Sequence, residues 1–492
     1  MWNFGLIFTG SESTETRESK QIIGIEIRQG IKTGMKRIVQ IGAAVATLLM
    51  LGAPRTFAQG GQDWFKTGTG LGVQKVRLAV PQFAARNAQT TPLEQVFHQV
   101  LMDDLNYSGI VDMVSTSFYP LNAPSMPNEL QGQQWSQAPA NAMMVAFGNL
   151  TATGTSLSLS GYLYDVRQTP SLSILEKIYT GAATQDGARQ LAHEFADDII
   201  SRLSGGVPGI AQTKIAYVSN RSGHKEIWEM DYDGANEHQL THLGTISLTP
   251  RWSPDDSHIA FTCFEAYRKI VSAQICMYST LTNRVTYFPR FPGTNSSPAW
   301  SPDGNQLAFM ASLNGDPEIY VSDTSGRNLH RLTYSVAVST SPTWNPKTGN
   351  QIIFVSDRGG LPDLFEMNSD GSSMQKIPMS AATGVAAKDL PATGYVIDPT
   401  WSPNGELIAF SWRRPAGNYD IYVMDLASHQ LIELTRDSGQ NERPSWAPDG
   451  RHIVFESTRS GSLQVWSMLA DGSEARQLTT TGRNESPNWS WH

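Results

Sequence analysis

Hydrophobic and polar positions alternate in short runs over the C-terminal part of the chain, and these runs recur in a fixed order. A strand that ends at Trp is followed by a Ser-Pro-Asp-Gly turn and an apolar strand such as Ile259-Ala-Phe. A third strand, such as Ile319-Tyr-Val, precedes a fourth that ends in Leu-Thr. Alternation with period two is typical of half-buried strands, and Pro and Gly favour tight turns. Each repeat therefore predicts four antiparallel strands.

The tryptophans set the length of the repeat. They stand in a Pro-x-Trp phrase at Trp252, Trp300, Trp344, Trp401, Trp446 and Trp489. The successive spacings of 48, 44, 57, 45 and 43 residues match one four-stranded blade of a β-propeller. An insertion, Pro378–Asp398, accounts for the longest spacing. Six equivalent aromatic positions indicate packing between blades rather than a ligand cage, because packing positions repeat with the fold.

The two ends of the repeat region predict a closed ring. The first repeat begins at Lys214-Ile-Ala-Tyr-Val-Ser, the second strand of the pattern, and lacks a Trp strand. The last repeat consists of a Trp strand alone, Pro487-Asn-Trp489-Ser. Pairing residues 485–491 with the blade begun at 213–242 completes a sixth blade and leaves no open sheet edge. We therefore predict an all-β six-bladed β-propeller over 213–492, closed by the C-terminal strand.

A different pattern precedes the repeats. Alternating runs predict strands, and apolar residues at helical spacing predict two amphipathic helices. The strands are expected at 76–83, 109–114, 143–150, 156–166 and 174–182, and the helices at 92–106 and 187–203. Together they predict a small mixed α/β domain over 73–206. No zinc site is expected at His193-Glu194, because Asp197 stands where an H-E-x-x-H motif needs its second histidine.

The N-terminal region has the pattern of an export signal. Met35-Lys-Arg is followed by a largely apolar run of 14 residues, 38–51, and then by the small residue Ala58. This order is typical of a secretory signal peptide, and the apolar run is shorter than the roughly 20 residues that a membrane span needs. We predict a signal peptide over 35–58, cleaved between Ala58 and Gln59. Residues 1–34 are then an over-extended, disordered start, and 59–72 a flexible tail.

Composition and cysteine usage narrow the function classes. The 492 residues carry a net charge of −8, whereas nucleic-acid binders usually have a basic surplus. The only two cysteines, Cys263 and Cys276, lie 13 residues apart on neighbouring strands of one predicted hairpin. In an oxidising compartment they can form a disulfide; the alternative is two buried free thiols. Their number and spacing predict no metal site.

Nothing in the sequence predicts an enzyme or a cofactor. No G-x-S-x-G motif occurs, and the ten histidines, including His224 and His238, lack ligand spacing. The repeats diverge in the loops that precede each Pro-x-Trp, and loops on a rigid scaffold are where binding residues gather. These loops are Thr245–Leu248, Gly293–Ser297, Val338–Ser341, Pro378–Asp398, Gly439–Glu442 and Arg483–Ser486. They predict a protein-docking face. The alternatives are ordinary solvated loops, an exported propeller that binds a carbohydrate or peptide, and a propeller-containing hydrolase.

Taken together, the motifs resemble one family. Leu-Glu-Gln-Val-Phe at 93–97 and Asp-Asp-Leu-Asn-Tyr-Ser-Gly-Ile at 103–110 precede six repeats of Pro-x-Trp-Ser-Pro-Asp-Gly. From about residue 73 to 492 the chain resembles the TolB family of the Tol-Pal envelope system. The resemblance implies a periplasmic, monomeric, non-enzymatic adaptor that spans no membrane and binds no nucleic acid. It would support outer-membrane integrity and the inward movement of that membrane during cell division.

The resemblance also implies partners and contact residues. The propeller would bind the peptidoglycan-associated lipoprotein Pal, with other outer-membrane lipoproteins as further candidates. The N-terminal region would bind the inner-membrane protein TolA. By position, the Pal contacts fall at Thr294, Asn295, Ser296, Ser297, Thr340 and Ser341. The TolA contacts fall in the tail, at Asp63, Trp64 and Phe65.

Overall fold

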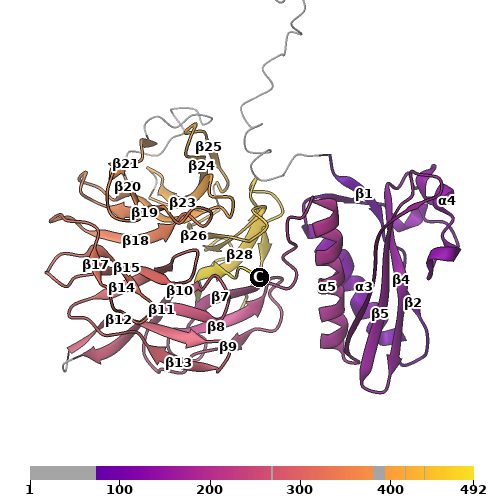
Figure 1. Ribbon diagram of the computed structural model, residues 1–492, viewed down its shortest axis with the longest axis horizontal. Helices are drawn as coiled ribbons and strands as arrows, with labels where there is room; N and C mark the ends of the chain where they lie inside the picture. The colour runs from indigo at the N-terminus through magenta and orange to yellow at the C-terminus, as the bar shows by residue number, and fades with distance from the viewer. Residues whose placement is uncertain (1–73, 268–269, 380–393, 416, 437) are drawn as a thin grey trace, which may run out of the picture. The chain divides into compact units, whose positions relative to one another are not determined.

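Six four-stranded antiparallel sheets follow a small α/β domain along the chain (Figure 1). The computed structural model describes residues 74–492 except 268–269, 380–393, 416 and 437. All of these belong to one compact unit, Gly61–His492. Several sequence predictions lie outside the described residues. They are the start at 1–34, the signal peptide with Ala58 and Gln59, the tail with Asp63, Trp64 and Phe65, and most of the insertion Pro378–Asp398.

Each sheet is one blade, and its strands follow one another outward from the innermost strand. Blade one has β30 (Asn484–Trp489), β7 (Lys214–Ser219), β8 (Glu226–Asp231) and β9 (His238–Gln239). Blade two has β10 (Ser247–Trp252), β11 (His258–Tyr267), β12 (Ile270–Ser279) and β13 (Arg284–Tyr287). Blade three has β14 (Asn295–Trp300), β15 (Gln306–Ala311), β16 (Glu318–Asp323) and β17 (His330–Arg331).

The remaining three blades have the same order. Blade four has β18 (Ser339–Trp344), β19 (Gln351–Ser356), β20 (Asp363–Asn368) and β21 (Gln375–Lys376). Blade five has β22 (Val396–Trp401), β23 (Leu407–Arg413), β24 (Tyr419–Asp425) and β25 (Leu431–Glu433). Blade six has β26 (Asn441–Trp446), β27 (His452–Ser457), β28 (Gln464–Leu469) and β29 (Arg476–Gln477). The six innermost strands contact one another in a ring, in the order β30, β10, β14, β18, β22 and β26.

The C-terminal strand closes this ring, which confirms the prediction of a six-bladed propeller. β30 pairs antiparallel with β7, and Trp489 lies opposite Ile215. The Trp489 indole Nε1 donates a hydrogen bond to Thr213 Oγ1 at 2.7 Å. Blade one is thus built from both ends of the propeller sequence.

The repeated tryptophans pack between blades, as predicted. Trp344 of blade four lies in one apolar cluster with Ala308 and Ile319 of blade three. Trp401 and Trp446 pack in the same way against the blade that precedes each of them.

The Ser-Pro-Asp-Gly turn forms hydrogen bonds within itself and with the strand that follows. Ser301 donates to Asp303 and accepts the N–H of Gln306 at 2.9 Å. These motifs therefore build the blades rather than a ligand site.

The N-terminal domain has one sheet of order β3-β1-β4-β5-β6, with β2 paired to β4. The strands are β1 (Val76–Ala79), β2 (Ala84–Ala85), β3 (Val111–Met113), β4 (Met144–Thr153), β5 (Ser156–Asp165) and β6 (Leu172–Ala182). The helices are α3 (Thr91–Tyr107), α4 (Gly132–Ser136), α5 (Gln185–Leu203) and the 3-10 turns η2 (Thr116–Phe118) and η3 (Pro127–Glu129).

Both long helices pack on the same sheet face (Figure 1), where Phe97 and Phe195 are fully buried. The first strand is shorter than its predicted range because Pro81, which has no N–H to donate, follows it. The pattern also did not indicate α4, whose Trp135 covers part of the other face beside Phe147. Among the helices that the structure describes, none has the length and apolar character of a transmembrane segment.

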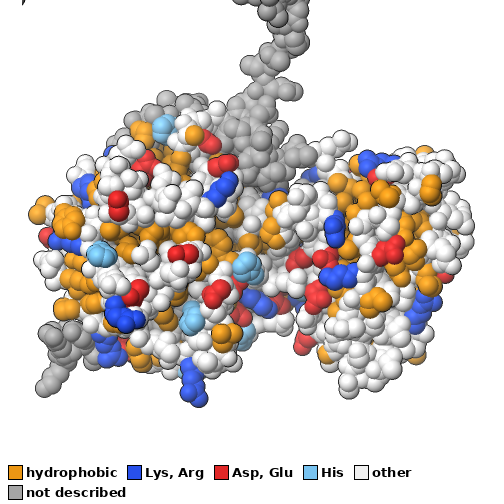
Figure 2. Space-filling model, in the orientation of Figure 1, with side chains coloured by type: hydrophobic (Ala, Val, Ile, Leu, Met, Phe, Trp, Pro, Cys, Tyr) orange, Lys and Arg blue, Asp and Glu red, His pale blue; other side chains and the backbone are white. Residues whose placement is uncertain are grey.

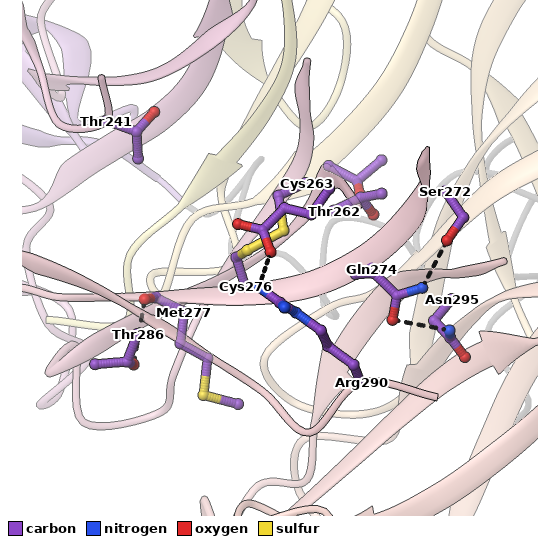
Figure 3. The surroundings of a disulfide bond; sticks show 12 residues. Thr241, Thr262, Cys263, Ser272, Gln274, Cys276, Met277, Thr286, Arg290 and Asn295 are labelled. Carbon is purple, nitrogen blue, oxygen red and sulfur yellow. Dashed lines mark hydrogen bonds and ion pairs between the residues drawn. A yellow bond between two sulfur atoms is a disulfide. The ribbon is translucent and has the colours of Figure 1, made fainter. Parts of the chain in front are cut away.

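Cys263 on β11 and Cys276 on β12 form a disulfide, shown in Figure 3. The two cysteines are not directly opposite each other. Cys263 faces Gln274 and Cys276 faces Phe261, so the bond crosses the hairpin diagonally with a Cα–Cα distance of 5.8 Å. Both side chains are fully buried in the apolar cluster between blades one and two.

Reducing this disulfide is expected to lower the free energy of unfolding by about 2–3 kcal/mol, because the cross-link restricts a short loop in the unfolded chain. The measurement is a denaturant titration with and without reductant, with thiol titration to verify cleavage. A Cys263→Ala/Cys276→Ala variant, insensitive to reductant, is the control. An unchanged midpoint after verified reduction would contradict the prediction.

Candidate functional site

A repeated hydrogen-bond network anchors the loops that were predicted to form the docking face. In four blades the threonine of the Leu-Thr pair donates to a side chain at the start of the third strand. The pairs are Thr241 with Glu226, Thr333 with Glu318, Thr435 with Asp420 and Thr479 with Gln464. Each threonine hydroxyl also accepts the next backbone N–H of that strand, at 2.9–3.0 Å. The loops therefore start from fixed, buried positions.

The predicted loop residues do not share one environment. Thr294 is exposed, and Ser296 and Thr340 are half-buried. Asn295 is only 1 % exposed, and its amide donates to Phe291 O at 3.0 Å and to Gln274 Oε1 at 3.2 Å (Figure 3). Its side chain therefore links blade three to blade two. Asn441 links blade six to blade five and Asn484 links blade one to blade six in the same way, so we do not carry Asn295 forward as a contact residue.

The same loops expose large apolar side chains that sequence reasoning missed. Ile246 precedes β10, Tyr334, Val336 and Val338 precede β18, and Tyr395 precedes β22. Val336 is 93 % exposed and Tyr334 73 %. All five lie in connections from a fourth strand to the next first strand, which share one face of the ring. We call this set the apolar loop face. Exposed apolar residues gathered on one face are typical of a protein-docking surface.

The innermost strands share a backbone feature that shapes the central channel. In each, the residue before the Pro-x-Trp phrase has a left-handed backbone, with φ between 49° and 53°. These residues are Thr249, Ser297, Ser341, Asp398, Arg443 and Ser486. The strand register shifts at the same place, which marks a β-bulge. All six line a channel cavity of about 120 Å³.

Charge is concentrated at three positions of this channel. Arg443 on β26 donates to both oxygens of Glu456, at 2.9 and 3.1 Å. Burial alone would lower the Arg443 pKa, but the Glu456 and Asp398 carboxylates outweigh burial and raise it. Arg251 has no ion pair among the described residues; its Nη1 donates to Pro250 O at 2.9 Å. Burial lowers the pKa of Arg251 to about 10.

Asp398 on β22 completes the set. Its Oδ2 atom is buried and has no hydrogen-bond partner among the described residues. β22 belongs to blade five and β10 to blade two, so Asp398 and Arg251 come from opposite sides of the six-strand ring. Sequence reasoning missed both residues. For Asp398 the available signal was the residue before each Pro-x-Trp, which is Ser or Thr in four repeats and charged only at Asp398 and Arg443. For Arg251 the signal was the middle residue of Pro-x-Trp, which is charged only there.

A second cavity, of about 370 Å³, lies beside the channel on blades one and six. Glu485 in its wall pairs with Lys225 and, at 3.4 Å, with Arg483. Burial and repulsion by Glu456 and Asp398 raise the pKa of Glu442 to about 7. This side of the channel therefore changes charge near neutral pH.

On the face shown in Figure 2, the blue and red side chains of the propeller are interspersed with polar and hydrophobic ones, so the described residues on that face form no large patch of one charge.

One cluster in the described part of the chain has the residue types of a metal site: Cys263, Glu265 and Cys276. Its potential ligands are already engaged. The two sulfurs are bonded to each other (Figure 3), and Glu265 forms an ion pair with Arg290. His193, the other residue considered for a metal, instead contacts Asp104 through Nδ1 at 2.8 Å.

Comparisons with known proteins agree with this architecture. The model of the TolB amino-terminal domain matches residues 69–172, and the model of the TolB beta propeller domain matches residues 201–392 and 381–492. A crystal structure of TolB from Acinetobacter baumannii superposes with a TM-score of 0.69 at 25 % sequence identity. The match covers 85 % of this chain and 97 % of that one.

Curated relatives match over a shorter range. A protein named TolB homolog from Chlorobium chlorochromatii is 32 % identical over 283 residues, 56 % of this chain and 60 % of the relative. A Tol-Pal system protein TolB from Desulfosudis oleivorans is 30 % identical over 269 residues, 54 % of this chain and 58 % of the relative. The chain thus spans about 60 % of the length of these relatives. Because the family models match most of the chain in the order α/β domain then six blades, the chain belongs to the TolB family.

Proposed function

We propose that this chain is a non-enzymatic, monomeric adaptor of the Tol-Pal system in the periplasm. Its propeller binds the peptidoglycan-associated lipoprotein Pal through the apolar loop face, and its N-terminal tail, 59–72, binds TolA. In this role it supports outer-membrane integrity and the inward movement of that membrane during division. The observation that carries the proposal is the joint match to both TolB domain models, together with relatives named as Tol-Pal system proteins.

The geometry of the loops supports docking of a protein. Val336, Val338 and Tyr334 form an exposed apolar segment that enters β18 directly. The half-buried Thr340 follows them, and the channel-lining Ser341 lies beside it. The loop that carries these side chains is held in place, since the Val338 N–H donates to Asp357 Oδ1 at 2.8 Å, and side chains on a preorganised loop lose little conformational entropy on binding. A partner that covers this segment would bury apolar surface with little loss of conformational entropy.

The test is a pull-down from envelope extract with the purified chain as bait. Wild type is expected to recover Pal, a lipoprotein with a peptidoglycan-binding domain. Val336→Asp places a charge in the centre of the apolar loop face and is expected to weaken recovery about tenfold or more. Leu281→Asp is the matched control, because Leu281 is 79 % exposed in the turn between β12 and β13, on the opposite face of the ring.

A deletion of residues 59–72, or the triple substitution of Asp63, Trp64 and Phe65 by alanine, separates the two partners. TolA recovery is expected to fall, and Pal recovery to persist. If wild type recovers no such lipoprotein, or if Val336→Asp and Leu281→Asp recover it equally, the proposal is wrong for the loop face. Turnover of a small substrate that depends on the same loops would instead indicate a hydrolase.

A further inference from the structure

We propose that the central channel is a binding site for a small zwitterion that carries both a carboxylate and an ammonium group, of the size of a free α-amino acid. Arg251 would hold the carboxylate and Asp398 the ammonium. This inference goes beyond the proposed adaptor function, since it concerns the wall of the channel and not the exposed loops.

The first support is the state of Arg251. Arg251 is half-buried in the channel wall, and a partly desolvated guanidinium without a hydrogen-bonded anion is costly, because charges removed from water are normally paired. Arg443, in the same channel, has such a partner in Glu456. Arg251 has only the carbonyl of its neighbour Pro250 among the described residues, so most of its donors point to no protein acceptor. A ligand carboxylate fits a planar guanidinium with two parallel hydrogen bonds.

The repeat itself shows that this charge is not needed for the fold. The residue between Pro and Trp is Arg251 in blade two, and Ala299, Thr343, Thr400, Ser445 and Asn488 in the other five. Five neutral side chains serve the same structural position. The arginine breaks the symmetry of the ring at one point, as a ligand site does and a packing position does not.

The second support is Asp398, which comes from the opposite side of the ring. Its buried Oδ2 lacks a donor among the described residues, although carboxylate oxygens accept several hydrogen bonds. An ammonium group supplies three donors and the opposite charge. Arg251 and Asp398 attract each other across the channel, but no hydrogen bond or ion pair joins them among the described residues. Both charges therefore face one cavity from two walls and fit the two opposite charges of one ligand.

The cavity has room for a small zwitterion. A water molecule needs about 10–15 Å³ of such space, so about 120 Å³ accommodates roughly ten water-sized groups, and a free α-amino acid such as alanine fits. The lining outside the charged residues is mostly Ser, Thr, Pro and Trp, which offers hydroxyl groups beside apolar surface.

The experiment uses the whole chain and three small ligands: alanine, propionate, which lacks the ammonium group, and isopropylamine, which has a methyl group in place of the carboxylate. Binding is measured by calorimetry and by saturation-transfer NMR up to about 10 mM ligand, since a site of this kind is expected to bind in the millimolar range or tighter. Alanine is expected to bind at least about tenfold more tightly than propionate or isopropylamine, each of which satisfies one charge only.

Two variants assign the roles. Arg251→Gln is expected to weaken alanine binding about tenfold or more, and Asp398→Asn to remove the preference for alanine over propionate. Arg327→Gln, in the exposed turn between β16 and β17, removes the same charge outside the channel and should leave binding unchanged. Thermal unfolding verifies that each variant is folded, and the three-ligand comparison on wild type needs no variant.

Two outcomes would overturn the inference: no saturable alanine binding to wild type, or equal binding to wild type and folded Arg251→Gln. Equal affinity for alanine and propionate in wild type would equally refute a zwitterion site. None of these measurements depends on Pal or TolA. A negative binding result would therefore refute the zwitterion site and not the adaptor function, and a negative pull-down would refute the adaptor function and not the zwitterion site.

Discussion

Replacing Trp489 by alanine is expected to lower the free energy of unfolding by about 3–5 kcal/mol, the range for deleting a fully buried aromatic side chain. Trp489 is 2 % exposed and belongs to the apolar cluster that includes Ile215 and Tyr217 of β7. Its indole N–H also donates a hydrogen bond to Thr213 Oγ1, directly before β7 of blade one. Weakening β30 leaves the edge of β7 unpaired and opens the ring between blades six and one.

Denaturant unfolding followed by tryptophan fluorescence and circular dichroism measures this loss. Trp491→Ala is the matched control: Trp491 lies two residues further on, is half-buried, and is expected to cost clearly less. Deletion of residues 484–492 is expected to give an aggregating chain in size-exclusion chromatography. A deletion variant that unfolds as cooperatively as wild type would show that closure by β30 contributes little.

The closure was predictable from sequence because each blade repeats a local pattern. Pro-x-Trp, Ser-Pro-Asp-Gly and Leu-Thr each encode contacts within a few residues or with the next blade, and six copies reinforce one interpretation. The missing strand at Lys214 and the spare strand at Trp489 then admit one solution. The N-terminal domain was predicted at the level of its main strands and helices, because their apolar periodicity is local as well.

The channel could not be predicted in the same way. Whether Arg251 and Asp398 meet in one cavity depends on the closed ring and on the left-handed bulge that aims Asp398 inward. The alternation of hydrophobic and polar residues predicts neither the curvature of the ring nor the sign of φ at a given residue. Asn295 is the reverse case. A polar loop residue is expected to be exposed, but the Asn295 side chain is buried and donates a hydrogen bond to Gln274.

Loss of a buried acid in the N-terminal domain is expected to be comparably destabilising. Asp104 on α3 contacts His193 Nδ1 on α5 at 2.8 Å, and accepts a hydrogen bond from Tyr232, which follows β8 of the propeller. Asp104→Ala leaves the His193 and Tyr232 side chains buried without this acceptor and should cost about 3–5 kcal/mol. The control, Asp103→Ala, removes an exposed carboxylate next in sequence and should cost about 0.5 kcal/mol or less.

The same contact gives the stability of the protein a pH dependence of defined sign. Burial alone would lower the His193 pKa, but the hydrogen bond and charge of Asp104 outweigh burial and raise it. Asp233 also favours the charged imidazole and Arg189 opposes it. A histidine whose pKa is higher in the folded than in the unfolded state contributes stability that is complete below the unfolded pKa, about 6.5. That contribution is lost as pH rises through the folded pKa.

We therefore expect the free energy of unfolding to fall as pH rises from about 6 through the His193 titration. Part of the fall belongs to Glu442 and Asp197, whose pKa values burial raises to about 7 and about 6 and whose stabilising contributions are also lost with rising pH. His193→Gln separates the histidine from these acids, because it removes only the histidine contribution and should flatten the upper part of the curve. Denaturant midpoints at closely spaced pH values give the result. Parallel curves for wild type and His193→Gln above pH 6 would refute the prediction, because they mean that the pKa of His193 is the same in the folded and the unfolded protein.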